Sequence, residues 1–336
     1  MRFRRNSLRH AGATALGTAV LLIGMATPAF AAHGPHSGGG GGGGGTSGGG
    51  GGSSTTGNDL SWPQCGGSFP SYPAFGIAGV NGGLANSSNP CFGPSTSYPS
   101  YSQSELYWAL AKSTGVVASQ PKASLYVNTG DPGNVYNGSL ITDWPTSSSA
   151  SDPYGSCTTT TVSTNSGPKT AGQNSNACAW QYGYNRAAQD TTWLTQEAQK
   201  VSTQESSVPI PSQASSYPWW LDVETGNSWQ TGSTGQQMNV ADLQGMVAAL
   251  QAAGVTNAGQ VGVYSTSYQW GMITGTPGAT VNNAANNLWG LPDWVPGATS
   301  QSGAAANCSA TNMFTGDKVT LTQWVASGLD GDYVCP

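Results

Sequence analysis

The fold is most clearly indicated by the stretch Trp219-Trp220-Leu221-Asp222-Val223-Glu224-Thr225. Side chains alternate along a strand, so Asp222 and Glu224 are expected on one face, roughly 6–7 Å apart along the chain. At the carboxyl end of a parallel barrel strand, that face lines the active-site cup. Mutual repulsion and desolvation by the tryptophans would raise one carboxyl pKa and keep a proton available as a general acid. The alternative is the wet face of an ordinary strand.

Around this stretch, short β-like runs alternate with longer helical runs from Asn58 to Pro336, which is typical of parallel βα units. The length is one that a single α/β barrel can fill. The predicted fold class is therefore α/β, a TIM-type barrel with disulfide-bonded loop insertions. Strands are expected at 59–62, 75–80, 124–128, 219–224, 260–265, 293–297, 319–324 and 329–334.

Helices are expected at 105–117, 181–206 and 239–253. In the last of these, Asn239 can act as the N-cap and Gly254 can end the helix. Little helix is expected after 268–273, so loops should join the last three strands. The Ser/Thr/Gly-rich segment 129–180 is interpreted as a long loop insertion.

The N-terminal segment Met1–Ala31 resembles a secretory signal peptide: an Arg-rich start, an apolar run and the small-x-small pattern Ala29-Phe30-Ala31. An uncleaved anchor is the alternative, but the run is shorter than the ~20 apolar residues of a spanning helix. Residues 32–57 form a glycine-rich tail or linker with the composition of a flexible coil. The chain is expected to be secreted, extracellular or cell-wall associated, without stable membrane insertion after cleavage.

Six cysteines follow the tail, an even number that predicts disulfides in an exported chain. Six cysteines allow 15 connectivities. Sequential pairing is preferred because each pair then brackets a Gly/Ser/Pro-rich loop. The expected bonds are Cys65–Cys91, Cys157–Cys178 and Cys308–Cys335.

Charge and histidine content exclude several classes of function. Beyond residue 31 the chain has six basic and fifteen acidic residues, and this excess of negative charge argues against a nucleic-acid partner. The three histidines are His10, His33 and His36, so the body has none for a Ser-His-Asp, Cys-His or zinc site. Acid–base chemistry must come from carboxylates. No metal or cofactor is required, and a monomer is expected.

Two other acidic positions can join Asp222 and Glu224. Asp59 opens the first predicted strand, and Asp330 lies in the last. First and last strands are neighbours in a closed barrel, so these acids can line a shared rim. A turn at the Asp-Gly dipeptide is the alternative for Asp330, and Asp332 is the weaker candidate.

Aromatic side chains suggest the class of ligand. Twelve Trp and thirteen Tyr with few cations suit neutral or cationic glycans, whose apolar faces stack on rings. Tyr126, Tyr264 and Trp324 are expected in a cleft at strand ends. Asn81 and Asn128 also end strands and could orient a substrate amide, although ordinary loop capping explains them equally well.

The ordered motifs resemble the strands of the family 25 glycoside hydrolases, which are muramidase-type lysozymes. The motifs are DLSWPQ, FGIAGVNGG, SLYVNTG, WWLDVE, VGVYS, DWVPGA, VTLTQW and LDGDY. The resemblance implies a (β/α)5(β)3 barrel and hydrolysis of β-1,4 bonds after N-acetylmuramic acid in peptidoglycan. It assigns the general acid to Glu224 and the companion acid, which stabilises the substrate acetamido group, to Asp222. Asp59 and Asp330 match the family's first-strand and last-strand aspartates.

The sequence also departs from that family. Val80-Asn81 stands where a basic residue often occurs, and YVNTG replaces an aromatic-His-aromatic pattern on the third strand. These changes concern the substrate groove, so they leave the particular glycan open more than the carboxylate chemistry. Two alternatives remain: a barrel that binds glycan without cleaving it, and an extracellular structural protein.

Overall fold

A computed structural model describes residues 55–82, 87–148, 151–256, 260–275, 287–326 and 329–336. The predicted signal peptide, 1–31, and nearly all of the glycine-rich segment 32–57 lie outside these residues. Among the described residues, no helix combines the length and the apolar character needed to cross a bilayer.

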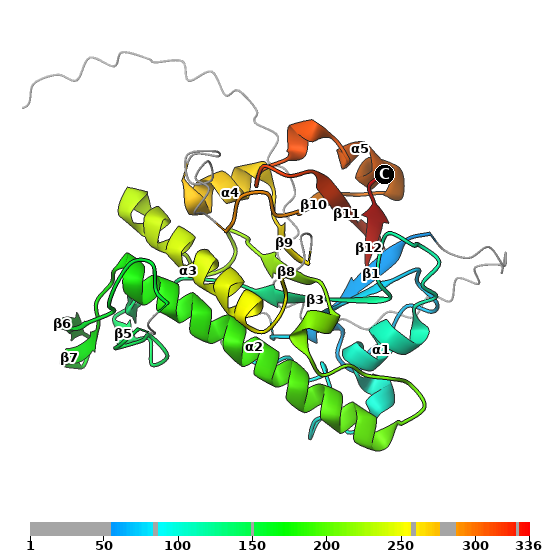
Figure 1. Ribbon diagram of the computed structural model, residues 1–336, viewed down its shortest axis with the longest axis horizontal. Coiled ribbons are helices and arrows are strands. Elements are labelled where there is room, and N and C mark those ends of the chain that lie inside the picture. The colour runs from blue at the N-terminus through cyan, green and yellow to red at the C-terminus, as the bar shows by residue number, and fades with distance from the viewer. Residues whose placement is uncertain (1–54, 83–86, 149–150, 257–259, 276–286, 327–328) are drawn as a thin grey trace, which may run out of the picture.

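Eight strands close into a barrel, which confirms the predicted α/β barrel (Figure 1). In barrel order they are β1 (Gly57–Leu60), β2 (Gly76–Gly79), β3 (Ala123–Asn128), β8 (Trp219–Asp222), β9 (Val261–Tyr264), β10 (Asp293–Ala298), β11 (Val319–Ala326) and β12 (Leu329–Val334). The first seven run parallel, and β12 is antiparallel to both β11 and β1. Every predicted strand position is confirmed, with small shifts at the ends.

Five α-helices accompany the strands: α1 (Glu105–Lys112), α2 (Asn176–Gln204), α3 (Gly232–Ala252), α4 (Ser267–Thr274) and α5 (Gln301–Asn307). They follow β2, β3, β8, β9 and β10, whereas a single 3-10 turn at Trp62–Gln64 lies between β1 and β2. The prediction that only loops join the last three strands is wrong, because α5 lies between β10 and β11. Its short stretch of small residues is capped by Ser300, whose hydroxyl accepts from Gly303 N at 3.1 Å.

The start of α3 also differs from the sequence-based prediction. Asn239 does not cap the helix; it is buried within it, and its Nδ2 donates to Gln230 O at 2.9 Å and to Ile273 O at 2.8 Å. The preceding residues carry no apolar periodicity, so their helical state was not visible from pattern alone. The predicted end is confirmed: Gly254 has φ +90° and its N–H donates to Gln251 O at 3.0 Å.

The long helices α2 and α3 pack side by side on one flank of the barrel (Figure 1). Glycines make this close approach possible. A Cβ built on Gly183 would lie 1.9 Å from Asp242 O, and one on Gly245 would lie 1.9 Å from Trp180 O. The close packing of α2 against α3 therefore requires residues without a Cβ at these two positions.

The predicted insertion 129–180 contains more regular structure than a loop. It holds two hairpins, β4 (Val135–Tyr136) with β5 (Ser139–Leu140), and β6 (Thr159–Thr164) with β7 (Gly167–Gly172). β-Branched threonines in β6 favour the extended conformation. The final residues belong to α2. All three disulfides have the predicted sequential pairing, and Cys157–Cys178 ties the insertion to the first turn of α2.

Two sets of buried side chains form the core. One set lies inside the barrel: Phe75, Ile77, Tyr126, Trp220, Tyr264, Trp294 and Leu321. The other, which includes Leu125, Leu221 and Val263, lies between the strands and the helices. The alternation of side chains along each strand separates the two sets.

Candidate carboxylate site

Three aspartates are buried inside the barrel towards the carboxyl ends of its parallel strands. Asp59 on β1, Asp222 on β8 and Asp332 on β12 are 4%, 2% and 0% exposed. Fully buried acids are rare without a paired charge, and these have no basic partner among the described residues. Such a concentration of perturbed carboxyls in one place is typical of functional sites.

The first and last strands bring Asp59 to the acids of β12. In the register of the two strands, Asp59 lies opposite Asp330 and Gly57 lies opposite Asp332. Burial and, next, the charge of Asp330 raise the pKa of Asp59 to about 8, against the opposing effect of a hydrogen bond from Gln323. Burial, followed by the charges of Asp59 and Asp330, holds the pKa of Asp332 well above its usual range. These acids therefore do not all ionise at neutral pH.

Gln323 on β11 connects Asp59 to an aromatic side chain. Its Nε2 donates to Asp59 Oδ2 at 3.0 Å, and its Oε1 accepts from the Tyr264 hydroxyl at 2.8 Å. The sequence analysis did not identify Gln323. The alternation in VTLTQW was the available signal, since it places Gln323 on the same face as Leu321, inside the barrel.

Asp222 ends β8 and meets Asp59 across the barrel. The two carboxyls line one cavity of about 10 Å³ together with Tyr126, Tyr264, Trp294 and Gln323. This is the space of a single water molecule, so it forms the bottom of a site rather than a sugar subsite. Burial raises the pKa of Asp222 well above its usual range, and the charges of Glu224 and Asp59 add to the effect. Its Oδ1 is buried without a hydrogen-bond partner in the described part of the chain.

Glu224 lies two residues beyond the end of β8 and is half-buried. A turn holds its backbone, since Glu224 O accepts from Asn227 N at 3.1 Å and from Trp229 Nε1 at 2.8 Å. Burial is the main cause of the raised pKa of Asp222 and of Tyr264, and in both groups the charge of Glu224 is the next cause, so this carboxylate acts on the buried cluster. The structure thus brings together all four predicted acids, with Glu224 and the half-buried Asp330 nearest to solvent.

Trp294 forms the aromatic floor beneath these acids. Its ring centroid lies 4.6 Å from Tyr264, 5.6 Å from Trp220 and 6.4 Å from Tyr126, each in an edge-to-face arrangement. Tyr126 and Tyr264 line the cavity beside the acids and are buried, so they contribute to its base, and their role in binding a substrate stays a prediction. Sequence reasoning did not single out Trp294, because one Trp in an apolar strand is most often core.

Two predicted ligand-binding positions have other roles in the fold. Asn81 is buried, and its Oδ1 accepts from Asn128 N at 2.8 Å and from Asn128 Nδ2 at 3.1 Å. Asn81 Nδ2 donates to Asn128 O at 2.9 Å. The pair joins the ends of β2 and β3, which is the loop-capping alternative for both residues. Trp324, which was expected in the cleft, also lies elsewhere. Side chains alternate along β11, so Trp324 points to the opposite face from Gln323, outside the barrel, and lies against Gly331.

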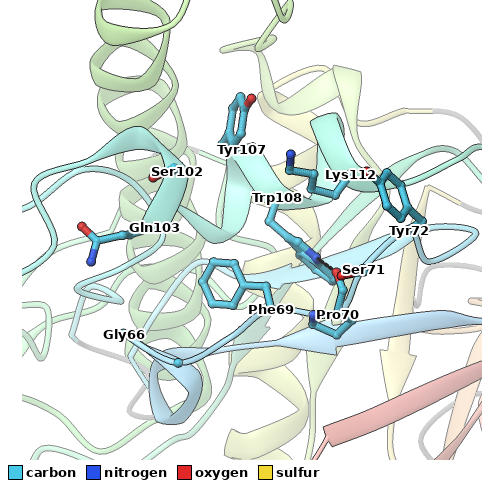
Figure 2. A pocket seen from close by; sticks show the side chains of 11 residues that line it. Gly66, Phe69, Pro70, Ser71, Tyr72, Ser102, Gln103, Tyr107, Trp108 and Lys112 are labelled. Carbon is cyan, nitrogen blue, oxygen red and sulfur yellow. Dashed lines mark hydrogen bonds between the residues drawn. The ribbon is translucent and has the colours of Figure 1, made fainter. Parts of the chain in front are cut away.

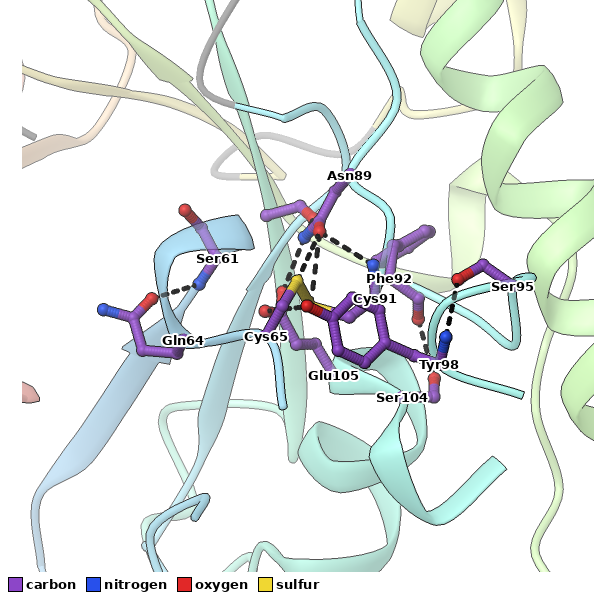
Figure 3. The surroundings of a disulfide bond; sticks show 11 residues. Ser61, Gln64, Cys65, Asn89, Cys91, Phe92, Ser95, Tyr98, Ser104 and Glu105 are labelled. Carbon is purple, nitrogen blue, oxygen red and sulfur yellow. Dashed lines mark hydrogen bonds between the residues drawn. A yellow bond between two sulfur atoms is a disulfide. The ribbon is translucent and has the colours of Figure 1, made fainter. Parts of the chain in front are cut away.

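One further buried acid lies close to this site. Glu105 begins α1, and burial raises its pKa to about 8 against a 2.7 Å hydrogen bond from Asn89 Nδ2. Figure 3 shows its other oxygen, Oε1, beside the Cys65–Cys91 disulfide, 3.0 Å from Cys91 Sγ. Within the described residues these three form the one grouping with possible metal-ligand spacing. A disulfide offers no thiolate to a metal, so the grouping is not a metal centre.

Comparison with known proteins adds no identity. No protein-family model, no curated protein and no solved structure matches this chain. The resemblance to family 25 glycoside hydrolases therefore depends on the motif residues alone.

Proposed function

We propose that this chain is a glycoside hydrolase acting outside the cell on β-1,4 bonds of an N-acetylated polysaccharide, with bacterial peptidoglycan as the substrate. One observation carries the proposal: acids from β1, β8 and β12, with Glu224 just beyond β8, converge at one end of the barrel. The lack of histidine past residue 36 supports it, because carboxyls are the remaining acid–base groups for such a reaction.

Glu224 and Asp222 have different roles because Asp222 is buried and Glu224 is only half-buried. Burial favours the protonated form of Asp222, so the pair holds a proton at neutral pH. Glu224, nearer to solvent, takes that proton from Asp222 and delivers it to the glycosidic oxygen as the bond to the sugar carbon breaks. Both carboxylates are then ionised and stabilise the positive charge that develops on the sugar and its acetamido group. Water adds to the sugar carbon, and its proton returns to the pair.

Reducing ends released from peptidoglycan and from chitin-type polymers test this function. The comparison uses the full chain, Glu224→Gln and the control Glu205→Gln, since Glu205 lies at the end of α2 outside the site. We expect Glu224→Gln to lower release at least 100-fold, the scale of general acid catalysis. The control should match the unmodified chain. Equal release by the Glu224→Gln variant and the unmodified chain contradicts the proposal.

A barrel that binds glycan without cleaving it is the second candidate. The observation that favours it is the small cavity at the acids, about 10 Å³, which has the space of one water molecule and not of a sugar ring. Binding to insoluble peptidoglycan without release of reducing ends by the unmodified chain would support this function instead.

A further inference from the structure

A second and larger pocket lies outside the barrel. It has a volume of about 250 Å³ and is formed between the β1–β2 connection and α1. Figure 2 shows Phe69 and Pro70 of the connection beside Trp108 of the helix, with Tyr107 above them and Lys112 and Tyr72 to one side. It shares no lining residue with the carboxylate cavity.

The base of this pocket is rigid. Trp108 is 2% exposed, its Nε1 donates to Pro70 O at 2.8 Å, and its ring meets Phe69 edge-to-face at 6.1 Å. Tyr107 is braced from behind by Tyr101, with centroids 4.8 Å apart. Rings held in this way lose little conformational freedom when a ligand binds, which favours affinity.

Tyr72 lies at the edge of the pocket in an unusual state. Its φ is +54°, in the left-handed region that large side chains rarely adopt, and its side chain is 67% exposed. A strained residue whose ring is not buried in the core suggests selection for a surface contact. The ring is available to a ligand that enters the pocket.

Lys112 supplies positive charge at the same opening. It is exposed, and neither ion pair of the described residues includes it: these are Arg186–Asp143 and Lys200–Glu197. Figure 2 shows its side chain between Tyr107 and Tyr72. A cation beside aromatic rings is notable in a chain with six basic residues beyond residue 31.

We propose that this pocket binds one carboxylate-bearing pyranose of a polysaccharide. The apolar face of the sugar would pack on the rings of Tyr107 and Tyr72, and the carboxylate would pair with Lys112. The volume falls below the roughly 300–1,000 Å³ of drug-sized ligand pockets, which suits a single sugar unit. The choice of polymer rests on the proposed function. Two kinds of sugar carry such a carboxylate: N-acetylmuramic acid in peptidoglycan, and a uronic acid in another polysaccharide.

The test measures dissociation constants by calorimetry for the full chain with four probes. N-Acetylmuramic acid and N-acetylglucosamine differ by a lactyl carboxylate, and glucuronic acid and glucose differ by a ring carboxylate. We expect at least one acid to bind 10-fold or more tightly than its neutral partner. Lys112→Gln should remove this difference, and Lys169→Gln, an exposed lysine on β7, should preserve it.

Two aromatic variants and a measurement of hydrolysis complete the experiment. Tyr107→Ala should abolish binding and Tyr107→Phe should retain it, which separates ring stacking from misfolding. Lys112→Gln should still release reducing ends from chitin-type polymers, which carry no carboxylate, so loss of hydrolysis and loss of this pocket are distinguishable. Equal affinity for acidic and neutral sugars, or unchanged discrimination in Lys112→Gln, overturns the proposal. Preference for glucuronic acid alone supports the pocket and assigns it to a uronic acid polymer.

Discussion

Asp59 and Asp330 lie opposite each other on β1 and β12, the two antiparallel neighbours that close the barrel. The pairing joins residues near the two ends of the described chain and places two like charges together. Since Asp59 is buried, the cost of ionising it next to Asp330 is large, and its pKa rises to about 8. Closure of the barrel therefore creates both the site and its electrostatic strain.

Stability should fall as the pH rises. The pKa of Asp59 is about 8 in the folded chain and about 3.8 in the unfolded chain, so folding favours the protonated carboxyl. The contribution of this group to the free energy of unfolding is therefore complete below about pH 4 and is lost as the pH rises through about 8. The raised pKa of Glu105, also about 8, acts in the same direction. We expect a lower melting temperature at pH 9 than at pH 5. Asp59→Asn should flatten this slope, whereas the exposed Asp143→Asn should not; a melting temperature that rises with pH contradicts the expectation.

Gln323 should be energetically coupled to Tyr264. Gln323→Leu removes the acceptor of the Tyr264 hydroxyl and a donor to Asp59, at a cost of about 1–3 kcal/mol in unfolding free energy. Tyr264→Phe already lacks the hydroxyl, so Gln323→Leu should cost less in that background. A double-mutant cycle by urea denaturation should give a coupling of at least about 0.5 kcal/mol. Strictly additive costs would show that the hydrogen bond does not contribute to stability.

The disulfides should differ in their effect on activity. Cys308–Cys335 and Cys157–Cys178 close loops with sequence separations of 27 and 21 residues, so each should stabilise the fold by about 3 kcal/mol. The first follows β12, which carries Asp330 and Asp332, whereas the second holds the insertion. Replacing both cysteines of a pair by Ser should lower the melting temperature in either case. Glycan hydrolysis at a temperature where both variants stay folded should fall only for Cys308/Cys335; equal loss in both pairs contradicts this assignment.

Glycine-to-alanine substitutions in helices should have opposite signs at different positions. Alanine usually stabilises a helix interior by about 1 kcal/mol relative to glycine. At Gly183 and Gly245 the added Cβ would overlap a carbonyl of the facing helix, so we expect a destabilisation of 2 kcal/mol or more, on the order of overpacking costs. Gly303 in α5 is the control, because a Cβ there would lie 3.3 Å from Ser300 Oγ, a side-chain atom that needs to shift by only a few tenths of an ångström. Unfolding by urea measures all three; unchanged stability in Gly183→Ala would mean that the helices can separate at no cost.

Several features were predictable because they depend on local pattern. Alternating and apolar runs located all eight barrel strands, and the composition of the intervening loops indicated the disulfide pairing. The convergence of the acids followed from the topology of a closed barrel, in which the first and last strands are neighbours. The early start of α3 and the helix α5 were not predictable, because small polar residues carry no periodic signal.

The amino-acid sequence by itself determined the strands and their order. Because histidine is lacking past residue 36, it also left the carboxylates in the strand motifs as the candidates for acid–base chemistry. Only the tertiary structure decided how deeply each acid is buried, that Gln323 donates a hydrogen bond to Asp59, and that Asn81 accepts one from Asn128. The physical reason is distance along the chain. Desolvation and hydrogen bonding act between side chains that become neighbours only when the barrel closes, and no local pattern records those contacts.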